Sequence, residues 1–279
     1  MKSSCPALAR HIPSRGKHCV SAVTSLGGEL FILRHGTVEV EVYDAVTLTI
    51  KRHVAFPQIN RCAIGRYRLA ACHRNSCLCA SDSYRNVIHK IELSGCSGVA
   101  EMWAVADSPR GLSVNNVHNL VVACSKARKL QEYTTHGRIV REIRLQAVSL
   151  MCPWHAVQLS TGDYVVAQNT SPGVVIVVGE DGQLVRSYSG ESSAVGHMDH
   201  PRSLVVTKKD DILVADYDNN RILTMAGSSG RVRVLALPID GKIRGPDGLC
   251  LDQLQGRLRL YVAEYGGPSR VLAFDGVAL

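Results

Sequence analysis

The sequence predicts an all-β fold, a six-bladed β-propeller of four-stranded antiparallel blades. The first observation is a repeat, because an apolar strand that opens with Pro recurs at spacings of 44, 48 and 45 residues. The prolines are Pro109, Pro153, Pro201 and Pro246. The second observation is that short apolar runs separated by turn residues fill the chain between them, without a helical period. These spacings are typical of one propeller blade, and 279 residues accommodate six.

The clearest repeat unit runs from His200 to Met225. It opens with His-Pro-Arg-Ser-Leu-Val-Val, continues with Ile-Leu-Val-Ala-Asp, and has Asn-Asn-Arg before a third apolar strand. The strands of this blade are expected at about 202–207, 211–216, 221–226 and 231–237. The unit resembles the NHL repeat. The resemblance implies a six-bladed propeller of the kind attached to TRIM-type ubiquitin ligases and to RNA regulators.

The whole chain, 1–279, is expected to form this one propeller, since two weaker units precede the four clear ones. The blades are expected at about 17–57, 58–107, 108–150, 151–197, 198–243 and 244–279. The last unit holds only three strands. Segment 5–12, Cys-Pro-Ala-Leu-Ala-Arg-His-Ile, is therefore expected to supply the outer strand of blade six and to close the ring, which removes an open sheet edge.

The cysteines and the N-terminal sequence indicate where in the cell the protein is expected. Ten cysteines are scattered through strand-like segments, which favours reduced, buried thiols and a cytoplasmic protein. Cys77 and Cys79 are expected on one face of a strand, with Leu78 on the other, and their spacing from Cys72 is not that of a zinc finger. The N-terminus lacks a signal-peptide core and no apolar stretch approaches the roughly 20 residues that cross a bilayer, so no membrane partner is expected.

Asp216 and Arg221 are interpreted as a structural pair of the repeat. A short Asp side chain at the end of a strand bonds the local backbone, and Arg packs beside it. Asp82 occupies the matching place in the second unit, while Gln168 and Glu264 occupy it in two others. These residues are therefore expected to hold turns and not to carry chemistry.

Blade six raises the question of catalysis. Pro246-Asp247-Gly248 and the two strands after it resemble the gluconolactonase and senescence-marker family, six-bladed propellers that hydrolyse sugar lactones with one divalent metal. The resemblance implies Asp247 as a ligand of a cation such as Ca²⁺. However, Arg202 stands where that family has a ligand Asn, and nothing near 15–25 matches the family's Glu. One carboxylate does not hold a hard divalent ion, so no catalytic residue and no cofactor are predicted.

The residues that follow the blade-opening prolines are expected to ring one end of the central channel. They are Arg110, Trp154, Arg202 and Asp247, with His155 next to Trp154. Two arginines and a Trp suit the capture of an anionic or carboxylate-bearing group by bidentate hydrogen bonds and stacking. The alternative is that the arginines simply pair with Asp247 and nearby backbone.

The predicted function is a non-catalytic recognition platform, a monomeric propeller that binds a protein or peptide on one rigid face. One alternative is RNA binding, because the formal net charge is +8, although no run of five basic residues occurs. The candidate RNA-binding residues are Lys126, Arg128, Lys129, Arg138 and Arg141. The other alternative is a metal-dependent hydrolase of the lactonase type, with the metal at Asp247.

Overall fold

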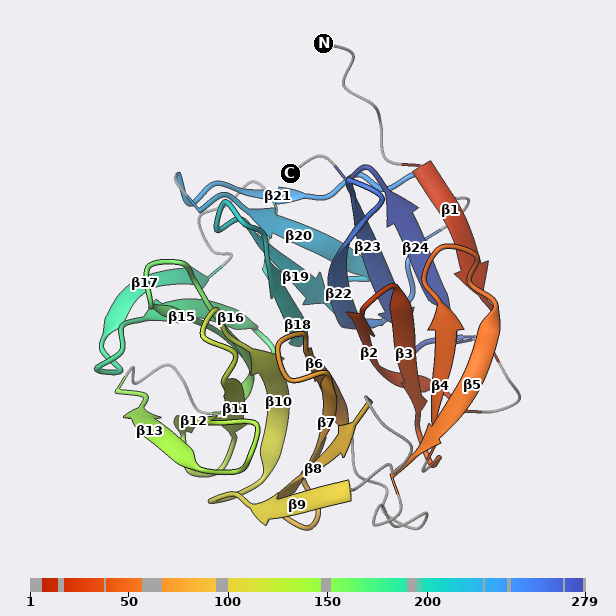
Figure 1. Ribbon diagram of the computed structural model, residues 1–279. Helices are drawn as coiled ribbons and strands as arrows, with labels where there is room; N and C mark the ends of the chain where they lie inside the picture. Colours follow the sequence, from red (N-terminus) through yellow and green to blue (C-terminus); the bar gives the residue numbers. More distant parts are fainter. Residues whose placement is uncertain are drawn as a thin grey trace.

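The chain forms six four-stranded antiparallel sheets arranged in a ring, which confirms the predicted six-bladed β-propeller (Figure 1). The computed structural model describes residues 7–14, 18–37, 39–56, 67–93, 100–146, 152–189, 195, 197–227, 229–239, 242–267 and 269–277. In these ranges no helix is long and apolar enough to cross a bilayer.

The strands follow one another along the chain within each blade. Blade one contains β2 (Val20–Leu26), β3 (Glu29–Arg34), β4 (Glu39–Asp44) and β5 (Ile50–Ala55). Blade two contains β6 (Arg68–Cys72), β7 (Cys77–Asp82), β8 (Val87–Glu92) and β9 (Ala100–Ala104). Blade three contains β10 (Pro109–Val114), β11 (Leu120–Cys124), β12 (Lys129–Tyr133) and β13 (Ile139–Arg144).

The second half of the ring repeats this order. Blade four contains β14 (Pro153–Gln158), β15 (Tyr164–Gln168), β16 (Val174–Val178) and β17 (Leu184–Ser189). Blade five contains β18 (Pro201–Val206), β19 (Ile212–Asp216), β20 (Arg221–Met225) and β21 (Val232–Val234). Blade six contains β22 (Pro246–Leu254), β23 (Arg257–Glu264), β24 (Val271–Asp275) and, from the start of the chain, β1 (Ala7–Ile12).

The apolar core is divided among the six contacts between neighbouring blades. Alternate residues of one strand belong to different clusters, because successive side chains point to opposite faces of a sheet. In β7, Cys77 and Cys79 pack toward blade three, whereas Leu78 and Ala80 pack toward blade one. The expected placement of these thiols between blades is thereby confirmed, and each blade depends on both neighbours to cover its two faces.

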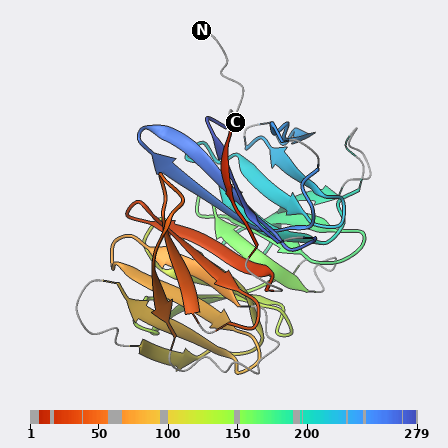
Figure 2. The ribbon, with the colours of Figure 1, turned by 90° about the vertical axis from the view of Figure 1, so that its right-hand side faces the viewer.

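The ring is closed by the N-terminal strand. β1 pairs antiparallel with β24, from Ala7 opposite Asp275 to Ile12 opposite Val271, so the two ends of the chain share one sheet (Figures 1 and 2). Closure was predicted from segment 5–12, of which residues 5 and 6 lie outside the described residues. Ile12 is buried in the cluster between blades six and one, so closure also seals that contact.

Strand direction defines two faces of the propeller. In blade three, β10 starts at Pro109, so loop 125–128, which joins β11 to β12, lies at that same end. Turns 115–119 and 134–138 lie at the opposite end. The other blades have the same antiparallel order. We call the end where the inner strands begin the proline face, and the opposite end the hairpin face.

Deleting residues 1–12 should destabilise the entire ring, because it removes the outer strand of blade six and the burial of Ile12. We expect a loss of about 3 kcal/mol or more in the free energy of unfolding, since burying one such side chain contributes about 1.5–3 kcal/mol before the lost strand hydrogen bonds are counted. Urea denaturation measures it, with deletion of residues 1–6 as the control. Equal midpoints for the two deletions would contradict the prediction.

Candidate binding site at the proline face

Four of the predicted mouth residues are β-bulges. The strand register shifts one residue after the opening proline of blades three to six. The bulged residues are Arg110, Trp154, Arg202 and Asp247. A bulge leaves one residue unpaired and re-aims its side chain, and bulges are frequent beside functional sites. The structure thus gives these four residues one common position in the repeat.

Asp247 is held by two guanidinium groups at the proline end of the channel. Its Oδ2 accepts a hydrogen bond from Arg68 Nη1 at 2.9 Å, and its Oδ1 accepts from Arg68 Nη2 at 3.2 Å and from Arg202 Nη1 at 3.0 Å. All three side chains are buried, and Asp247 is 1% exposed. Burial raises the pKa of Asp247, but the charges and hydrogen bonds of Arg68 and Arg202 outweigh it and leave that pKa below its ordinary value.

Sequence reasoning missed Arg68, because blade two lacks the opening proline that marked the other mouth residues. Arg68 lies opposite Ser81, at the register position that Ser203 holds opposite Ala215 in blade five. Aligning the two second strands on their terminal Asp would therefore have placed Arg68 one residue beyond the mouth position of Arg202. Arg68 also donates from Nη1 to the carbonyl oxygen of Ser21, so it joins blades one, two and six.

Two arginine–aromatic pairs lie at this face. The guanidinium carbon of Arg202 lies 3.2 Å from the ring centre of Tyr217, and that of Arg110 lies 5.1 Å from the ring of Trp154. Tyr217 is followed round the ring by Tyr265, with 6.4 Å between the ring centres. Both tyrosines are half-buried in the loops after β19 and β23. Stacking of this kind holds a guanidinium group flat and leaves its N–H groups directed outward in the plane.

His155 joins three inner strands inside the channel. The N–H of Leu204 in blade five donates to Nδ1 at 3.2 Å, so the ring proton lies on Nε2, which is 3.3 Å from the carbonyl oxygen of Leu112 in blade three. Burial and the nearby charge of Arg68 lower the pKa of His155 to about 4, so the ring is neutral. Gly111 is required beside it, since a Cβ there would lie 2.5 Å from the backbone of His155.

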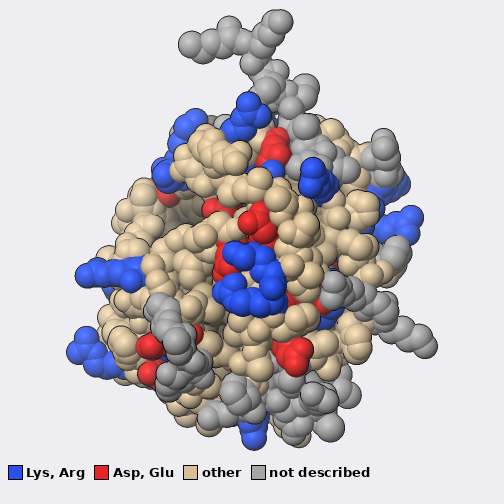
Figure 3. All heavy atoms as spheres, turned by 45° about the vertical axis from the view of Figure 1, so that its right-hand side comes forward, with Lys and Arg blue, Asp and Glu red and all other residues tan. Residues whose placement is uncertain are grey.

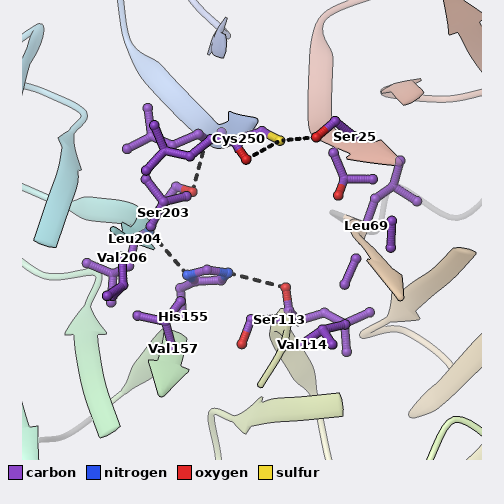
Figure 4. A pocket seen from close by; sticks show the side chains of 18 of the residues that line it. Ser25, Leu69, Ser113, Val114, His155, Val157, Ser203, Leu204, Val206 and Cys250 are labelled. Carbon is purple, nitrogen blue, oxygen red and sulfur yellow. Dashed lines mark hydrogen bonds between the residues drawn. The ribbon is translucent and has the colours of Figure 1, made fainter. Parts of the chain in front are cut away.

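The channel behind this ion pair forms a cavity of about 500 Å³ lined by the inner strands of all six blades (Figure 4). Arg68 and His155 line its inner part, while His73, Asn116 and Asp210 line it at the hairpin face. Arg202 and Asp247 lie beyond the lining. The buried ion pair therefore separates the cavity from the proline face.

The predicted RNA-binding residues do not form one surface. Lys126 and Arg128 are exposed in a loop of the proline face, whereas Arg138 is exposed at the hairpin face. Lys129 pairs with Glu142, and Arg141 pairs with Glu132 and Glu180 at 2.8 Å each. On the side of the molecule seen in Figure 3, basic groups are separated by wide areas of other residues. The five candidates are thus divided between two faces and several ion pairs.

The fold and topology define the class of this chain as a six-bladed β-propeller. Residues 198–224 match the NHL repeat, the family that the clearest unit resembles. No curated protein matches the sequence.

Similar solved structures include propellers with different activities. A virginiamycin B lyase from Staphylococcus aureus is 13% identical, with a TM-score of 0.68 over 97% of this chain and 99% of that one. A streptogramin B lyase is 12% identical, with a TM-score of 0.68 over 99% of this chain and all of that one. The WD40 propeller domain of Doa1 is 12% identical, with a TM-score of 0.61 over 96% of each chain. At these identities the likeness shows the fold alone.

The residues around Asp247 do not fit the divalent cation that the lactonase resemblance implies. Both carboxylate oxygens already accept hydrogen bonds from guanidinium groups, and Arg202 occupies the place of a metal-ligating Asn. A Ca²⁺ ion takes six to eight oxygen ligands, and two adjacent guanidinium charges would repel it. The geometry makes Asp247 the counter-ion of two arginines.

Replacing Asp247 with Asn should destabilise the protein by roughly 3–5 kcal/mol, because two buried arginines would lose their counter-charge. Urea denaturation at neutral pH measures the change. The matched control is Asp181→Asn on the surface, which keeps its local acceptor and should leave stability almost unchanged. A loss below about 1 kcal/mol for Asp247→Asn would show that the pair is not a buried structural unit.

The neutral state of His155 predicts a specific dependence of stability on pH. The unfolded chain takes up a proton near pH 6.5, whereas the folded protein does so only at about 4. Stability should therefore fall as the pH drops from about 6.5 to about 4, with roughly 3 kcal/mol from this residue. His155→Gln keeps a donor and an acceptor and should flatten the curve of urea midpoint against pH, unlike His136→Gln at the surface. Identical slopes for wild type and His155→Gln would refute the assignment.

Proposed function

We propose that the protein is a recognition platform that binds a peptide or protein partner at its proline face. The observation that carries this proposal is the two arginine–aromatic pairs, Arg110 with Trp154 and Arg202 with Tyr217. Arg, Trp and Tyr supply most of the binding energy in protein interfaces when a rigid surface presents them. Here the bulges and loops of a closed ring hold them in fixed positions, with Arg110 and Tyr217 half-buried and Trp154 and Arg202 buried.

The charge of this region favours an acidic group on the partner. Arg68 and Arg202 pair with one carboxylate, Asp247, while Arg110 lies over Trp154, so these four charged side chains have a net formal charge of +2. Within the described residues, the Nε groups of Arg110 and Arg202 are buried without a hydrogen-bond partner. A partner's carboxylate could bind the guanidinium group of the half-buried Arg110, since charge-assisted hydrogen bonds to guanidinium are strong and directional.

An exposed aromatic side chain extends the same face. Tyr84, 76% exposed, lies in the loop after β7, which corresponds to the loops of Tyr217 and Tyr265 in blades five and six, although it is one residue further from the strand. Tyrosine thus occurs in three corresponding loops, and the exposed ring of Tyr84 suits contact with a partner, since aromatic residues are enriched in protein interfaces. The proline face thus combines basic and aromatic groups.

The ionisable groups nearest the channel support a non-catalytic role. Asp247 is saturated by two guanidinium groups, and both ring nitrogens of His155 are engaged with backbone. A general base needs a free lone pair within reach of substrate. Neither group offers one at the proline face. Binding therefore accounts for the arrangement better than proton transfer does.

The test is selection of peptides from a random display library, followed by fluorescence anisotropy with the selected peptides. We expect acidic peptides, with Arg110→Ala and Tyr84→Ala each weakening binding by about tenfold or more. Arg138→Ala, at the hairpin face, is the matched control and should bind like wild type.

Two outcomes would overturn the proposal. One is that Arg110→Ala and Arg138→Ala bind the selected peptides equally well. The other is that the protein selects no peptide but binds single-stranded RNA at low salt, with loss of binding in Lys126→Ala or Arg128→Ala. That result would assign the exposed basic loop of blade three to RNA instead.

A further inference from the structure

A cluster outside the mouth combines one imidazole and two carboxylates. Asp199 and His200 precede β18, and Asp218 lies in the loop after β19, so all three belong to the proline face of blade five. The Nδ1 atom of His200 lies 2.8 Å from Asp199 Oδ1 and 2.7 Å from Asp218 Oδ2. The three ligand atoms lie within 4.8 Å of one another.

A single proton does not explain this geometry well. An imidazole nitrogen carries either one proton or one lone pair, in the plane of the ring, so it makes one well-directed hydrogen bond. Two carboxylate oxygens nevertheless approach Nδ1 at nearly equal distances. A cation at the point where the three atoms converge would give each of them a partner.

The negative charge of the cluster also favours a bound cation. Other acidic residues of this face form an ion pair with an arginine: Asp216 pairs with Arg221, and Glu264 pairs with Arg270. For Asp199 and Asp218, the described part of the chain supplies no Lys or Arg within 4.0 Å. Two carboxylates thus face each other with only an imidazole between them, although the chain as a whole carries a charge of +8.

The backbone holds the three residues in place. The N–H of Asp199 donates to Asp216 Oδ1 at 2.7 Å, and the N–H of Asp218 donates to the carbonyl oxygen of Asp199 at 3.2 Å. The N–H of His200 donates to the carbonyl oxygen of Thr170 in blade four at 3.0 Å. Ligands whose backbone is fixed in this way lose little entropy on binding.

We propose that Asp199, His200 and Asp218 bind a divalent transition-metal cation, with zinc as the best match. An imidazole nitrogen with two carboxylate oxygens suits Zn²⁺, whereas Ca²⁺ and Mg²⁺ prefer oxygen ligands alone. Tetrahedral bonds of about 2.0–2.2 Å place ligand atoms roughly 3.4 Å apart, so each carboxylate oxygen needs to move away from Nδ1 of His200 by little more than half an ångström.

The fourth coordination position would be open to solvent, because the three side chains are 33%, 35% and 46% exposed. Asp218 directly follows Tyr217, and His200 lies two residues before Arg202, so the metal would border one of the arginine–aromatic pairs. A partner's carboxylate or imidazole could then complete the coordination, a step that rests on the proposed function. Metal binding itself does not depend on it.

The experiment is titration of the reduced, chelator-treated protein with Zn²⁺ by calorimetry and with Co²⁺ by visible absorption. We expect one equivalent to bind and to raise the thermal midpoint, as a ligand specific for the folded state does. His200→Asn and Asp218→Asn should each weaken binding by at least about tenfold. Asn is chosen at position 200 because the residue has φ +50°, a conformation that Asn tolerates. His136→Gln is the matched control and should bind like wild type.

Several results would overturn the proposal. Absence of Zn²⁺ binding is one, and equal affinity in wild type, His200→Asn and Asp218→Asn is another. A thiolate-to-cobalt absorption band would assign binding to cysteines, of which Cys19 and Cys152 are half-buried. Equal affinity for Ca²⁺ would reject the transition-metal class. Thermal midpoints without metal verify that the variants are folded, and the peptide-binding assay of the proposed function is scored separately.

Discussion

Each blade has two apolar faces, and only a closed ring covers all of them. The six clusters between blades are the core of this protein, so no blade is expected to be stable alone. Pairing of β1 with β24 is therefore the contact on which the other features depend. It fixes the relative positions of inner strands, and the inner strands fix the bulges and loops of the proline face.

The ion pair at the channel end connects stability with binding. Burying Asp247 with two guanidinium groups carries a desolvation cost of several kcal/mol per ion, which only well-formed hydrogen bonds offset. One excess positive charge remains within this trio. That charge helps to keep His155 neutral, which lets the ring accept a hydrogen bond from Leu204. The same excess charge, together with that of Arg110 on the same face, would attract an acidic group of a partner.

The local sequence predicted the features that repeat from blade to blade. It missed those that depend on contacts between different blades or between loops of different strands. The proline spacing indicated four blades and two weaker units indicated the other two. The residue after each proline is a bulge in the structure, because a bulge is a local property of its strand. Arg68 was not predicted, because its blade lacks the opening proline and its role depends on a contact with blade six. Lys126 and Arg138, close in sequence, lie on opposite faces because β12 runs from one face to the other between them. The contacts of His200 depend on a loop that approaches from another strand.

The repeat separates structural positions from variable ones. In blades one, five and six, the last residue of the second strand forms a hydrogen bond with the chain segment that leads into the blade: Arg34 with Pro13, Asp216 with Asp199 and Glu264 with Arg244. The same three residues form an ion pair with a residue in the third strand, or directly before it in blade six, and the charges are reversed in blade one. The bulged residue has no such structural role in the strand pairing. It is Arg in blade three, Trp in blade four, Arg in blade five and Asp in blade six. The side chain at a bulge can therefore differ from blade to blade within one ring, although Arg202 and Asp247 also form a buried ion pair that stabilises it. The bulges, together with the loops beside them, are where recognition by this protein should be sought.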